Sequence, residues 1–394
     1  MKLKSFGKPR FDLKKFGKNY VASIAVFYLL FVFFYVLNYL NHPFAVIASD
    51  LVSFLTGAKI VRNGEGRLLY DLYEQFKYQL DVIAPLTKGN LLPFRGLPVT
   101  AFLFIPLTYL PLRTSYNIFL LINILAIYIL AKNLVKSFDL RKWEKFALFI
   151  LAFWPSVSSL ILGQYTPFLA LILLFIYSSL KNKKDFYAGL LSGLLLLKPQ
   201  TILITPFLYF YEKKINYLLG LILSTTALLL VSLVIVGPDV LASYFTFLEL
   251  TENSFYGSRP FHMFSLFASL KTLFPLMSNK FFYFVNAFFY LTSLVVLIKR
   301  RPKFNDFFLL AVIITLILST HSLVHDLIIL LIPISILLRK YLKKPTSSLK
   351  VLIIILYALP LVVLFGNTTF ASFILAGVAF YMFISLGHRL SNST

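Results

Sequence analysis

The sequence contains no cysteine, which excludes disulfide bonds and thiolate chemistry. Charged residues are scarce, at 13% of 394 positions, and unevenly signed, with 38 Lys and Arg against 15 Asp and Glu. The phosphate-cradling pattern GxxxxGK[ST] and the nucleophile pattern GxSxG are also absent. An ATP-driven machine and a hydrolase of the soluble GxSxG type are therefore not expected.

The chain is instead rich in apolar residues, which make up 59% of its positions. The apolar runs repeatedly approach the roughly 20 residues that one transmembrane helix needs. Aromatic residues account for 17%, and many flank these runs, where their rings suit the membrane interface. The composition predicts an all-α polytopic membrane protein.

The formal net charge of +23 could indicate a nucleic-acid-binding protein, but the basic residues do not gather in one polar region. They recur in short clusters between apolar runs, as is typical of loops retained on the cytoplasmic side of a membrane. The first apolar run, from Tyr20 to Leu40, follows a basic tail and lacks a small-residue cleavage site. We expect it to be an uncleaved first span in a multi-pass protein of the cell membrane.

Charge asymmetry favours twelve crossings within a single integral membrane domain, residues 1–394, with both termini cytoplasmic. Outer loops are expected at 41–113 and 237–280. The stretch "GLPVTAFLFIPLTYLPLR" is apolar but short and proline-broken, so we expect it to dip in and return on the outer side. Counting it as a full crossing would place neighbouring basic clusters on opposite sides. The spans after the first are expected at Ser115–Val135, Phe146–Leu162, Pro167–Leu180, Phe186–Leu197, Thr201–Tyr211, Ile215–Val236, Phe281–Ile298, Phe307–Ser319, Leu327–Leu338, Val351–Phe365 and Phe370–Leu386.

Several of these spans are shorter than a lone transmembrane helix, which indicates broken helices that line a cavity. The clearest break is "LLLLKPQTILITP", where two half-length apolar runs meet at Lys198, Pro199 and Gln200. Lys198 alone could be a snorkelling lysine or the partner of a nearby acid. Its position inside a proline-broken pair of helices favours anion binding.

With this topology, polar groups from five separate places in the chain meet at the outer ends of the spans. Ionisable groups near hydrocarbon are costly unless they are paired or functional, so their convergence predicts a site. The groups are Asp50, Lys59, Arg62, Gln164, Lys198, Gln200, Arg259, His262, His321, His325 and Asp326.

Asp50 follows Ser49 at the start of a half-apolar helix, where a carboxylate often does no more than cap the helix. For Asp50 taken alone, a capping role and a functional role both remain open. Gly57 favours a functional role for Asp50. At 3.6 residues per turn Gly57 falls almost below Asp50 and leaves backbone that a ligand could approach.

Other acidic and histidine pairs are weaker candidates. His321 and His325 have an i, i+4 spacing that suits a metal on a helix, but two histidines without a third ligand more often make hydrogen bonds. We therefore expect no metal and no cofactor. The pairs Asp71 with Glu74 and Glu249 with Glu252 are expected on solvated helix faces: none forms an acidic pair built for a divalent ion.

Several stretches together resemble the family 87 glycosyltransferases, polytopic enzymes of the GT-C type that include polyprenyl-phosphate-mannose-dependent mannosyltransferases. They are "SDLVSFLTGAKIV", "EGRLLYDLY", "PVTAFLFIPLTYLP", "GQYTPFLALIL" and "AGLLSGLLLLKPQTILITPFL". The resemblance extends over nearly the whole chain. It implies a GT-C-like bundle with an outer layer of re-entrant and amphipathic helices. The stretches "NLLPFRGLPV" and "THSLVHDL" match the family pattern only loosely.

The resemblance implies transfer of mannose or another hexose from a polyprenyl-phosphate donor to a lipid or glycan hydroxyl, with inversion, on the extracytoplasmic side. Asp50 matches the loop aspartate that acts as general base in the family, a role that one carboxylate can fill. Such a protein has membrane lipids as neighbours, no nucleic-acid partner and a place in cell-envelope or lipid glycosylation. The donor phosphate is expected at Lys198, Arg259, His325 and His321, and other substrate contacts at Gly57, Lys59, Arg62, Gln164 and Gln200.

The alternative is a transporter or flippase of lipid-linked or anionic substrates, which also needs broken helices and intramembrane charge. Transporters commonly carry paired broken helices in corresponding halves. Here the break at Lys198 has no matching partner, and the carboxylate of Asp50 lies at the outer rim rather than the midplane. A non-catalytic polymer-export subunit stays open as a third possibility.

Overall fold

The computed structural model describes residues 45–140, 149–252 and 256–391, together with Leu30, Phe31, Phe34, Tyr35, Leu37, Asn41 and His42. All regular elements in this part of the chain are helical. The predicted first span, Tyr20–Leu40, lies for the most part outside the described residues, as does the start of the predicted span Phe146–Leu162.

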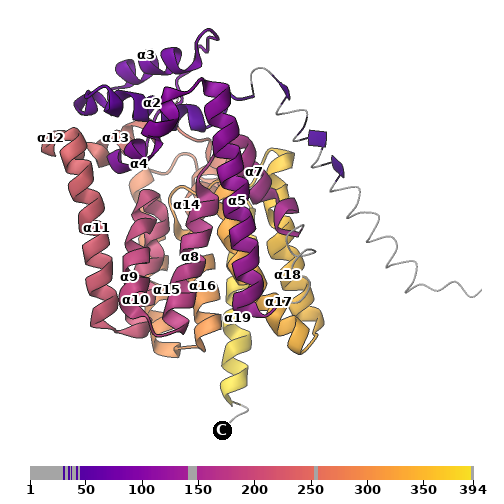
Figure 1. Ribbon diagram of the computed structural model, residues 1–394. Helices are drawn as coiled ribbons and strands as arrows, with labels where there is room; N and C mark the ends of the chain where they lie inside the picture. The colour runs from indigo at the N-terminus through magenta and orange to yellow at the C-terminus, as the bar shows by residue number, and fades with distance from the viewer. Residues whose placement is uncertain are drawn as a thin grey trace, which may run out of the picture.

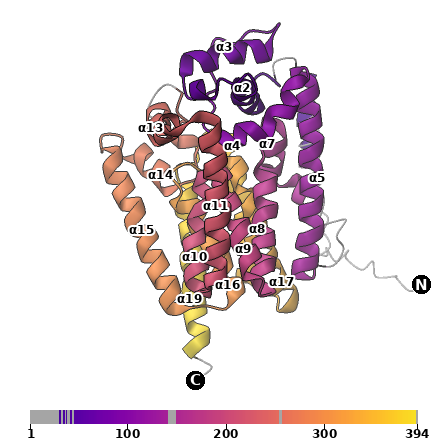
Figure 2. The ribbon, with the colours of Figure 1, turned by 60° about the vertical axis from the view of Figure 1, so that its left-hand side comes forward.

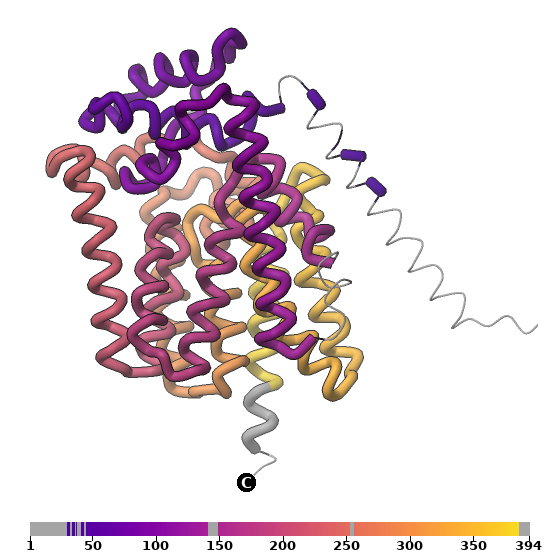
Figure 3. The backbone as a smooth tube through the Cα atoms, viewed as in Figure 1, coloured from indigo at the N-terminus to yellow at the C-terminus, as the bar shows by residue number. Residues whose placement is uncertain are grey.

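The helices form two layers (Figures 1 and 3). Three short helices, α2 (Leu51–Arg62), α3 (Leu72–Ile83) and α4 (Pro98–Phe104), lie across one end of an upright bundle. We call this end the capped end. The bundle helices are α5 (Leu112–Phe138), α7 (Trp154–Leu162), α8 (Thr166–Lys181), α9 (Asp185–Gly193), α10 (Ile204–Glu212), α11 (Ile215–Val236), α15 (Asn279–Arg300), α16 (Phe304–Leu318), α17 (Leu331–Lys343), α18 (Ser347–Ala358) and α19 (Ala371–Ser391).

Shorter elements connect or extend these helices. Two 3₁₀ segments lengthen α9 and α10 on either side of Lys198, and one each lengthens α17 and α18. The remaining elements belong to the capped end. These remaining elements are η1 (Gly66–Leu68), η2 (Ile105–Tyr109), α12 (Pro238–Ala242), α13 (Tyr244–Glu252), η5 (Pro260–His262) and α14 (Leu266–Leu273). The lengthening segments are η3 (Leu194–Leu197), η4 (Pro199–Leu203), η6 (Val324–Leu330) and η7 (Leu359–Phe365).

The bundle helices run alternately toward and away from the capped end (Figure 2). Turns rich in lysine and arginine meet at the opposite end, which we call the basic end. Arg339, in the last turns of α17, pairs with Asp139 after α5 at 2.7 Å. The Tyr211 hydroxyl at the end of α10 donates to the carbonyl of Pro302, between α15 and α16, at 3.1 Å. The basic clusters between the described bundle helices are therefore segregated to one end of the molecule.

Four helices among the described residues are long and apolar enough to cross a membrane: Leu112–Phe138, Ile215–Val236, Asn279–Arg300 and Ser347–Phe365. The other spans predicted from Phe146 onward each coincide with a shorter helix or with two consecutive helices, as far as the described residues extend. The all-helical fold is confirmed, whereas the number of twelve crossings stays a prediction.

The core is built around α16 and the η6–α17 pair. Nearly every residue of α16, and of η6 and α17 from His325 to Leu337, is buried. By contrast, α11 and α15 turn apolar side chains such as Leu230, Val234 and Phe284 outward. A surface of this kind fits a membrane protein, because such side chains need an apolar environment.

The proline-broken segment after Gly96 forms α4 and η2 and packs against α2 throughout. Phe104 stacks on Phe54 with ring centroids 5.0 Å apart, and Arg62 donates to the carbonyl of Thr108 at 2.8 Å. The segment therefore begins and ends at the capped end. Its return to the outer side of a membrane stays a prediction.

Candidate active site

Asp50 occupies the N-cap position of α2, but its side chain makes no capping hydrogen bond. Its backbone N–H donates to the carbonyl of Leu162 at 2.8 Å, which joins α2 to the end of α7. Its carboxylate Oδ2 accepts a hydrogen bond of 2.6 Å from Nε2 of Gln164. The interpretation of Asp50 as a mere helix cap is therefore wrong, because the carboxylate bonds Gln164 and caps no helix amide.

Gly163 brings Gln164 to this carboxylate. It ends α7 in the left-handed region with φ of 62°, a conformation that glycine adopts at little cost. A Cβ atom at this position would come within 2.8 Å of the Leu51 Cβ at the start of α2. Only glycine therefore allows the α7–α8 turn to approach α2 closely. Close packing of the α7–α8 turn against α2 therefore explains why glycine precedes Gln164.

Lys198 lies at the predicted break in the helices. Its backbone is extended, with φ of −128° and ψ of 90°, because the following Pro199 disfavours the helical conformation for the residue before it. Thr201 stabilises the break, since its hydroxyl donates to the carbonyls of Leu195 and Lys198 at 2.8 and 2.9 Å. The Tyr165 hydroxyl donates to the carbonyl of Leu197 at 2.9 Å and ties the break to α8.

Asp326 receives the Lys198 side chain in a buried ion pair. Its Oδ2 atom also accepts a hydrogen bond of 2.9 Å from the backbone of Leu323 and so closes the turn that starts η6. Its Oδ1 atom lies 3.7 Å from Nε2 of the buried His325. A lysine, a histidine and a carboxylate from two distant stretches are thereby fixed at the centre of the capped end.

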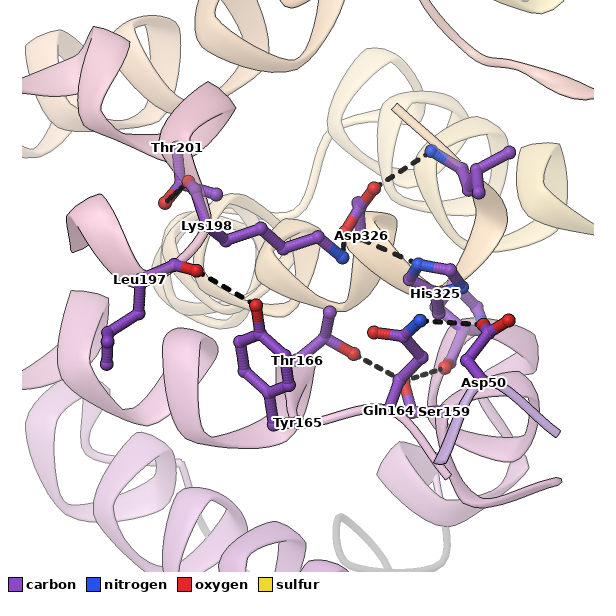
Figure 4. Close-up of polar contacts among 12 residues, drawn as sticks. Asp50, Ser159, Gln164, Tyr165, Thr166, Leu197, Lys198, Thr201, His325 and Asp326 are labelled. Atoms are coloured by element: carbon purple, nitrogen blue, oxygen red, sulfur yellow. Dashed lines mark hydrogen bonds and ion pairs between the residues drawn. The ribbon is translucent and has the colours of Figure 1, made fainter. Parts of the chain in front are cut away.

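Figure 4 shows Asp50, Gln164, His325, Asp326 and Lys198 gathered in one place. We call these five residues the central cluster. Two of its buried polar atoms, Oε1 of Gln164 and Nδ1 of His325, have no hydrogen-bond partner among the described residues. Buried polar atoms are normally paired, so these two are available to a ligand.

The electrostatic setting of Asp50 suits a proton acceptor. Burial raises the pKa of the Asp50 carboxyl above its ordinary value, and the nearby charge of Asp326 adds to this. The hydrogen bond from Gln164 and the charges of Lys198 and His321 act in the opposite direction. A carboxylate with a raised pKa is a stronger base than a solvated one.

A second group of charges surrounds the cluster. Glu252, at the end of α13, pairs with Arg95 Nη1 at 2.7 Å and with His321 Nδ1 at 3.4 Å. Burial acts to raise the pKa of Glu252, but His321 and Arg95 outweigh it and hold the pKa below its ordinary value. The expectation of a solvated helix face is wrong for Glu252, because Arg95 and His321 hold its half-buried carboxylate, whereas Glu249 is exposed as expected.

Three of the predicted substrate contacts are held elsewhere. Lys59 pairs with Asp81 of α3, and Arg62 bonds Thr108 and lies over the ring of Tyr109. The open backbone predicted at Gly57 is wrong, since a Cβ there would meet the Phe94 ring at 2.7 Å. These residues hold α2, α3 and α4 together, and we call these three helices the capping layer. Lys59 and Arg62 are distant from Asp50 because they lie toward the opposite end of α2.

The remaining candidates vary in position. His321 precedes η6 in a non-helical segment, so the helical spacing assumed for His321 and His325 is wrong. Gln200 is half-buried in η4, two residues beyond Lys198. The exposed Arg259 lies over the ring of Phe261 at 5.9 Å, in the segment whose Phe264 N–H donates to the carbonyl of Ser322.

The sequence placed Asp326 among the converging polar groups but predicted no specific role for it, and it predicted no site role for Glu252, Arg95 or Lys88. The charge of Asp50 acts on both Arg95 and Lys88 and opposes the lowering of their pKa values by burial. The signal for Asp326 was present in "LVHDLIILL", because a carboxylate within an apolar run requires a partner. Arg95 and Glu252 gave no such signal, since their pairing joins stretches that are far apart in the chain.

Comparison with known proteins gives one match. A family model described as glycosyltransferase family 87 matches residues 97–324. This stretch contains Gln164, Lys198 and His321, whereas Asp50 lies before it and Asp326 lies just beyond it. No curated protein and no solved structure matches the chain.

Proposed function

The chain belongs to glycosyltransferase family 87, and from that premise we propose that this membrane glycosyltransferase moves a hexose from a polyprenyl-phosphate donor to a hydroxyl acceptor. The observation that carries the proposal is the central cluster, which gathers the carboxylate of Asp50 and the buried Lys198 in one place. Inverting sugar transfer from a phosphate needs these two kinds of group. The identification of the sugar as a hexose, with mannose as the first candidate, rests on the family resemblance alone.

The proposed reaction is a single displacement. The acceptor hydroxyl loses its proton to the Asp50 carboxylate while its oxygen forms a bond to the anomeric carbon. The bond between that carbon and the phosphate oxygen breaks, and the electron pair leaves with the polyprenyl phosphate. General base catalysis of this kind contributes about 10² to 10⁴ in rate. Gln164 orients the carboxylate through its hydrogen bond of 2.6 Å.

Lys198 is the proposed principal ligand of the donor phosphate. Its ammonium group can stabilise the negative charge that develops on the leaving phosphate, which matters most where water is excluded. Asp326 holds Lys198 in place until the donor phosphate competes for it. His325 offers a buried Nδ1 without a described partner. His321 and the exposed Arg259 complete the proposed phosphate site.

Helix lengths favour a position for this site below the membrane surface. The helical stretch before Lys198 comprises nine residues of α9 and four of η3. At the usual rise per residue these span about 20 Å, against about 30 Å of hydrocarbon. If the basic end lies at the cytoplasmic surface, Lys198 would lie about 10 Å inside the opposite one.

The proposed sidedness follows from the segregation of charge. Lysine and arginine near span ends are retained in the cytoplasm, so the basic end would be cytoplasmic and the capped end extracytoplasmic. The donor then presents its sugar between the central cluster and the capping layer, with its prenyl tail in the membrane. The acceptor, a lipid or a glycan, reaches Asp50 from the capping layer.

The test is a transfer assay with purified protein, a panel of polyprenyl-phosphate hexoses and mass analysis of the lipids formed. We expect one donor to be consumed and Asp50→Asn to lower the rate at least about 100-fold, since the amide cannot accept the proton. Donor binding should persist, because the phosphate ligands are unchanged.

Asp71→Asn is the matched control, because Asp71 is also an N-cap aspartate of the capping layer but is exposed and caps α3 through its side chain. It should transfer sugar at the normal rate. Undiminished transfer by Asp50→Asn would remove the proposed base. A transporter would move the donor across proteoliposomes without forming a glycosidic bond, an outcome that the same mass analysis detects.

A further inference from the structure

A groove of about 500 Å³ opens between α8 and α9 near the basic end, far from the central cluster. Its walls change in character along their length. Toward the turn they are polar and basic, and toward the middle of the bundle they are apolar. Ser178, Asn182 and Lys184 line the polar part, and Phe175, Tyr187 and Leu190 line the apolar part.

The polar part of the groove lies in a strongly basic turn. Lys181, Lys183 and Lys184 lie within four residues, and all three are exposed. The ammonium group of Lys181 lies over the ring of Tyr177, 5.7 Å from its centroid. Lys184 lines the groove, and within the described residues its side chain makes no ion pair, although Asp185 follows it in the chain. An anion in the groove would therefore find a cation at its edge.

The backbone of this turn is fixed. Lys183 has a left-handed φ of 58°, and the N–H of Lys184 donates to the carbonyl of Ser179 at 2.9 Å. The Ser178 hydroxyl lies 3.3 Å from that of Ser137 on α5. The polar wall is consequently held by three helices rather than by one mobile loop.

We propose that this groove binds one anionic phospholipid. The phosphate of its headgroup contacts Lys184, Asn182 and Ser178, and one acyl chain lies along Phe175, Leu190 and Tyr187. Charge complementarity selects an anionic headgroup over a zwitterionic one, and the change from polar to apolar wall matches the boundary between headgroup and hydrocarbon. The site requires neither the donor nor the acceptor of sugar transfer.

The groove is connected to the central cluster through its two walls. Helix α8 begins next to Gln164, and α9 continues through η3 to Lys198. The far ends of these walls are joined by the hydrogen bond from Tyr165 to the carbonyl of Leu197. A lipid wedged between α8 and α9 therefore stabilises the pair of helices that positions Gln164 and Lys198.

The experiment measures lipid binding to the full-length protein in neutral detergent by native mass spectrometry, with phosphatidylglycerol and phosphatidylcholine of identical acyl chains. We expect phosphatidylglycerol to bind more tightly. Lys184→Gln should weaken that binding about fivefold, the effect of one lysine near an anionic headgroup. Lys183→Gln is the matched control, because it removes the same charge one residue away, outside the groove. It should change the affinity less than twofold.

Equal weakening by Lys183→Gln and Lys184→Gln would overturn the proposal, because it would mean that diffuse surface charge attracts the lipid. Equal affinity for the two lipids would also overturn it. Leu190→Trp gives a second readout, since the larger ring fills the apolar part of the groove and should displace the lipid with every lysine in place. If Leu190→Trp binds phosphatidylglycerol as tightly as the unchanged protein does, the lipid does not occupy this groove and the proposal is wrong. Thermal unfolding without added lipid confirms that each variant is folded.

Discussion

The capped end and the basic end of the bundle carry charge in different ways. At the capped end the ionisable groups of the central cluster are buried: Lys198 is 8% exposed, Asp326 4% and His325 2%. At the basic end the ion pair of Arg339 with Asp139 leaves the Asp139 side chain 74% exposed. The pair of Lys340 with the buried Asp306 still leaves the lysine side chain 26% exposed.

This difference in exposure distinguishes two kinds of charged side chain, those suited to orienting a membrane protein and those suited to catalysis. Exposed lysines and arginines keep their hydration, so they cost little and can be numerous. A buried charge loses its hydration and needs a partner with good geometry, and even then the pair is seldom a source of stability. The buried pair at the capped end is therefore better explained by function than by stability, and the following variants test that explanation.

The largest effect is expected at the Lys198–Asp326 pair. Lys198→Met leaves Asp326 buried without its counter-ion, which should lower the free energy of unfolding by about 3–5 kcal/mol. The double variant Lys198→Met with Asp326→Asn removes both charges and should recover much of this loss. Sugar transfer should be lost in both, because neither retains the proposed phosphate ligand. Thermal unfolding and transfer assays on the four members of the cycle measure the two effects.

The functional interpretation fails if the double variant transfers sugar at the normal rate. It also fails if Lys198→Met retains normal donor affinity, since the lysine would then be a structural counter-ion only. Asp326→Asn keeps an oxygen that can accept from the Leu323 N–H, so the turn before η6 should persist and isolate the effect of charge.

A smaller effect is expected from Gln164→Leu. The Gln164 hydrogen bond lowers the pKa of Asp50 against the larger raising effect of burial, so its loss should raise that pKa further. Because Asp50 must be deprotonated to act as a base, the acid limb of the pH–rate profile should move to higher pH.

Other ionisable groups also act on Asp50, namely Lys198, His321 and Asp326. The profile is therefore measured in His321→Gln as well, so that titration of the histidine is not mistaken for that of the carboxyl. Ser159→Ala is the control, because Ser159 belongs to the same α7–α8 region but bonds Pro155 and Thr166 instead of Asp50. An unmoved acid limb in Gln164→Leu excludes Asp50 as the titrating base.

The sequence predicted the helical fold and the approximate positions of most bundle helices, because long apolar runs interrupted by basic turns leave few alternatives. The predicted span Ile215–Val236 has the same bounds as α11, and the break at Lys198 lies where the proline requires it. The break was visible in the sequence because it depends on neighbouring residues only.

The site was less predictable because it depends on pairing between distant stretches. Asp50 and Gln164 are 114 residues apart, and Arg95 and Glu252 are 157 apart. Lys59 and Gly57 were wrongly expected to line the site, because helical periodicity gives the face of a residue but not what packs against it. Phe94 fills the space beside Gly57, and it comes from a loop whose path the sequence pattern does not reveal.

The smallest effect is expected at the basic end, from Arg339→Ala. Its pair with Asp139 at 2.7 Å is solvent-exposed, and such pairs are worth at most about 1 kcal/mol. We expect a change in unfolding free energy within that limit, which high salt reduces further, and unchanged sugar transfer. The measurement is thermal unfolding at low and high salt beside Lys198→Met. If Arg339→Ala destabilises the protein as much as Lys198→Met does, burial does not explain a difference in energy between the two ion pairs. The argument for a functional role of the buried Lys198–Asp326 pair would then fail.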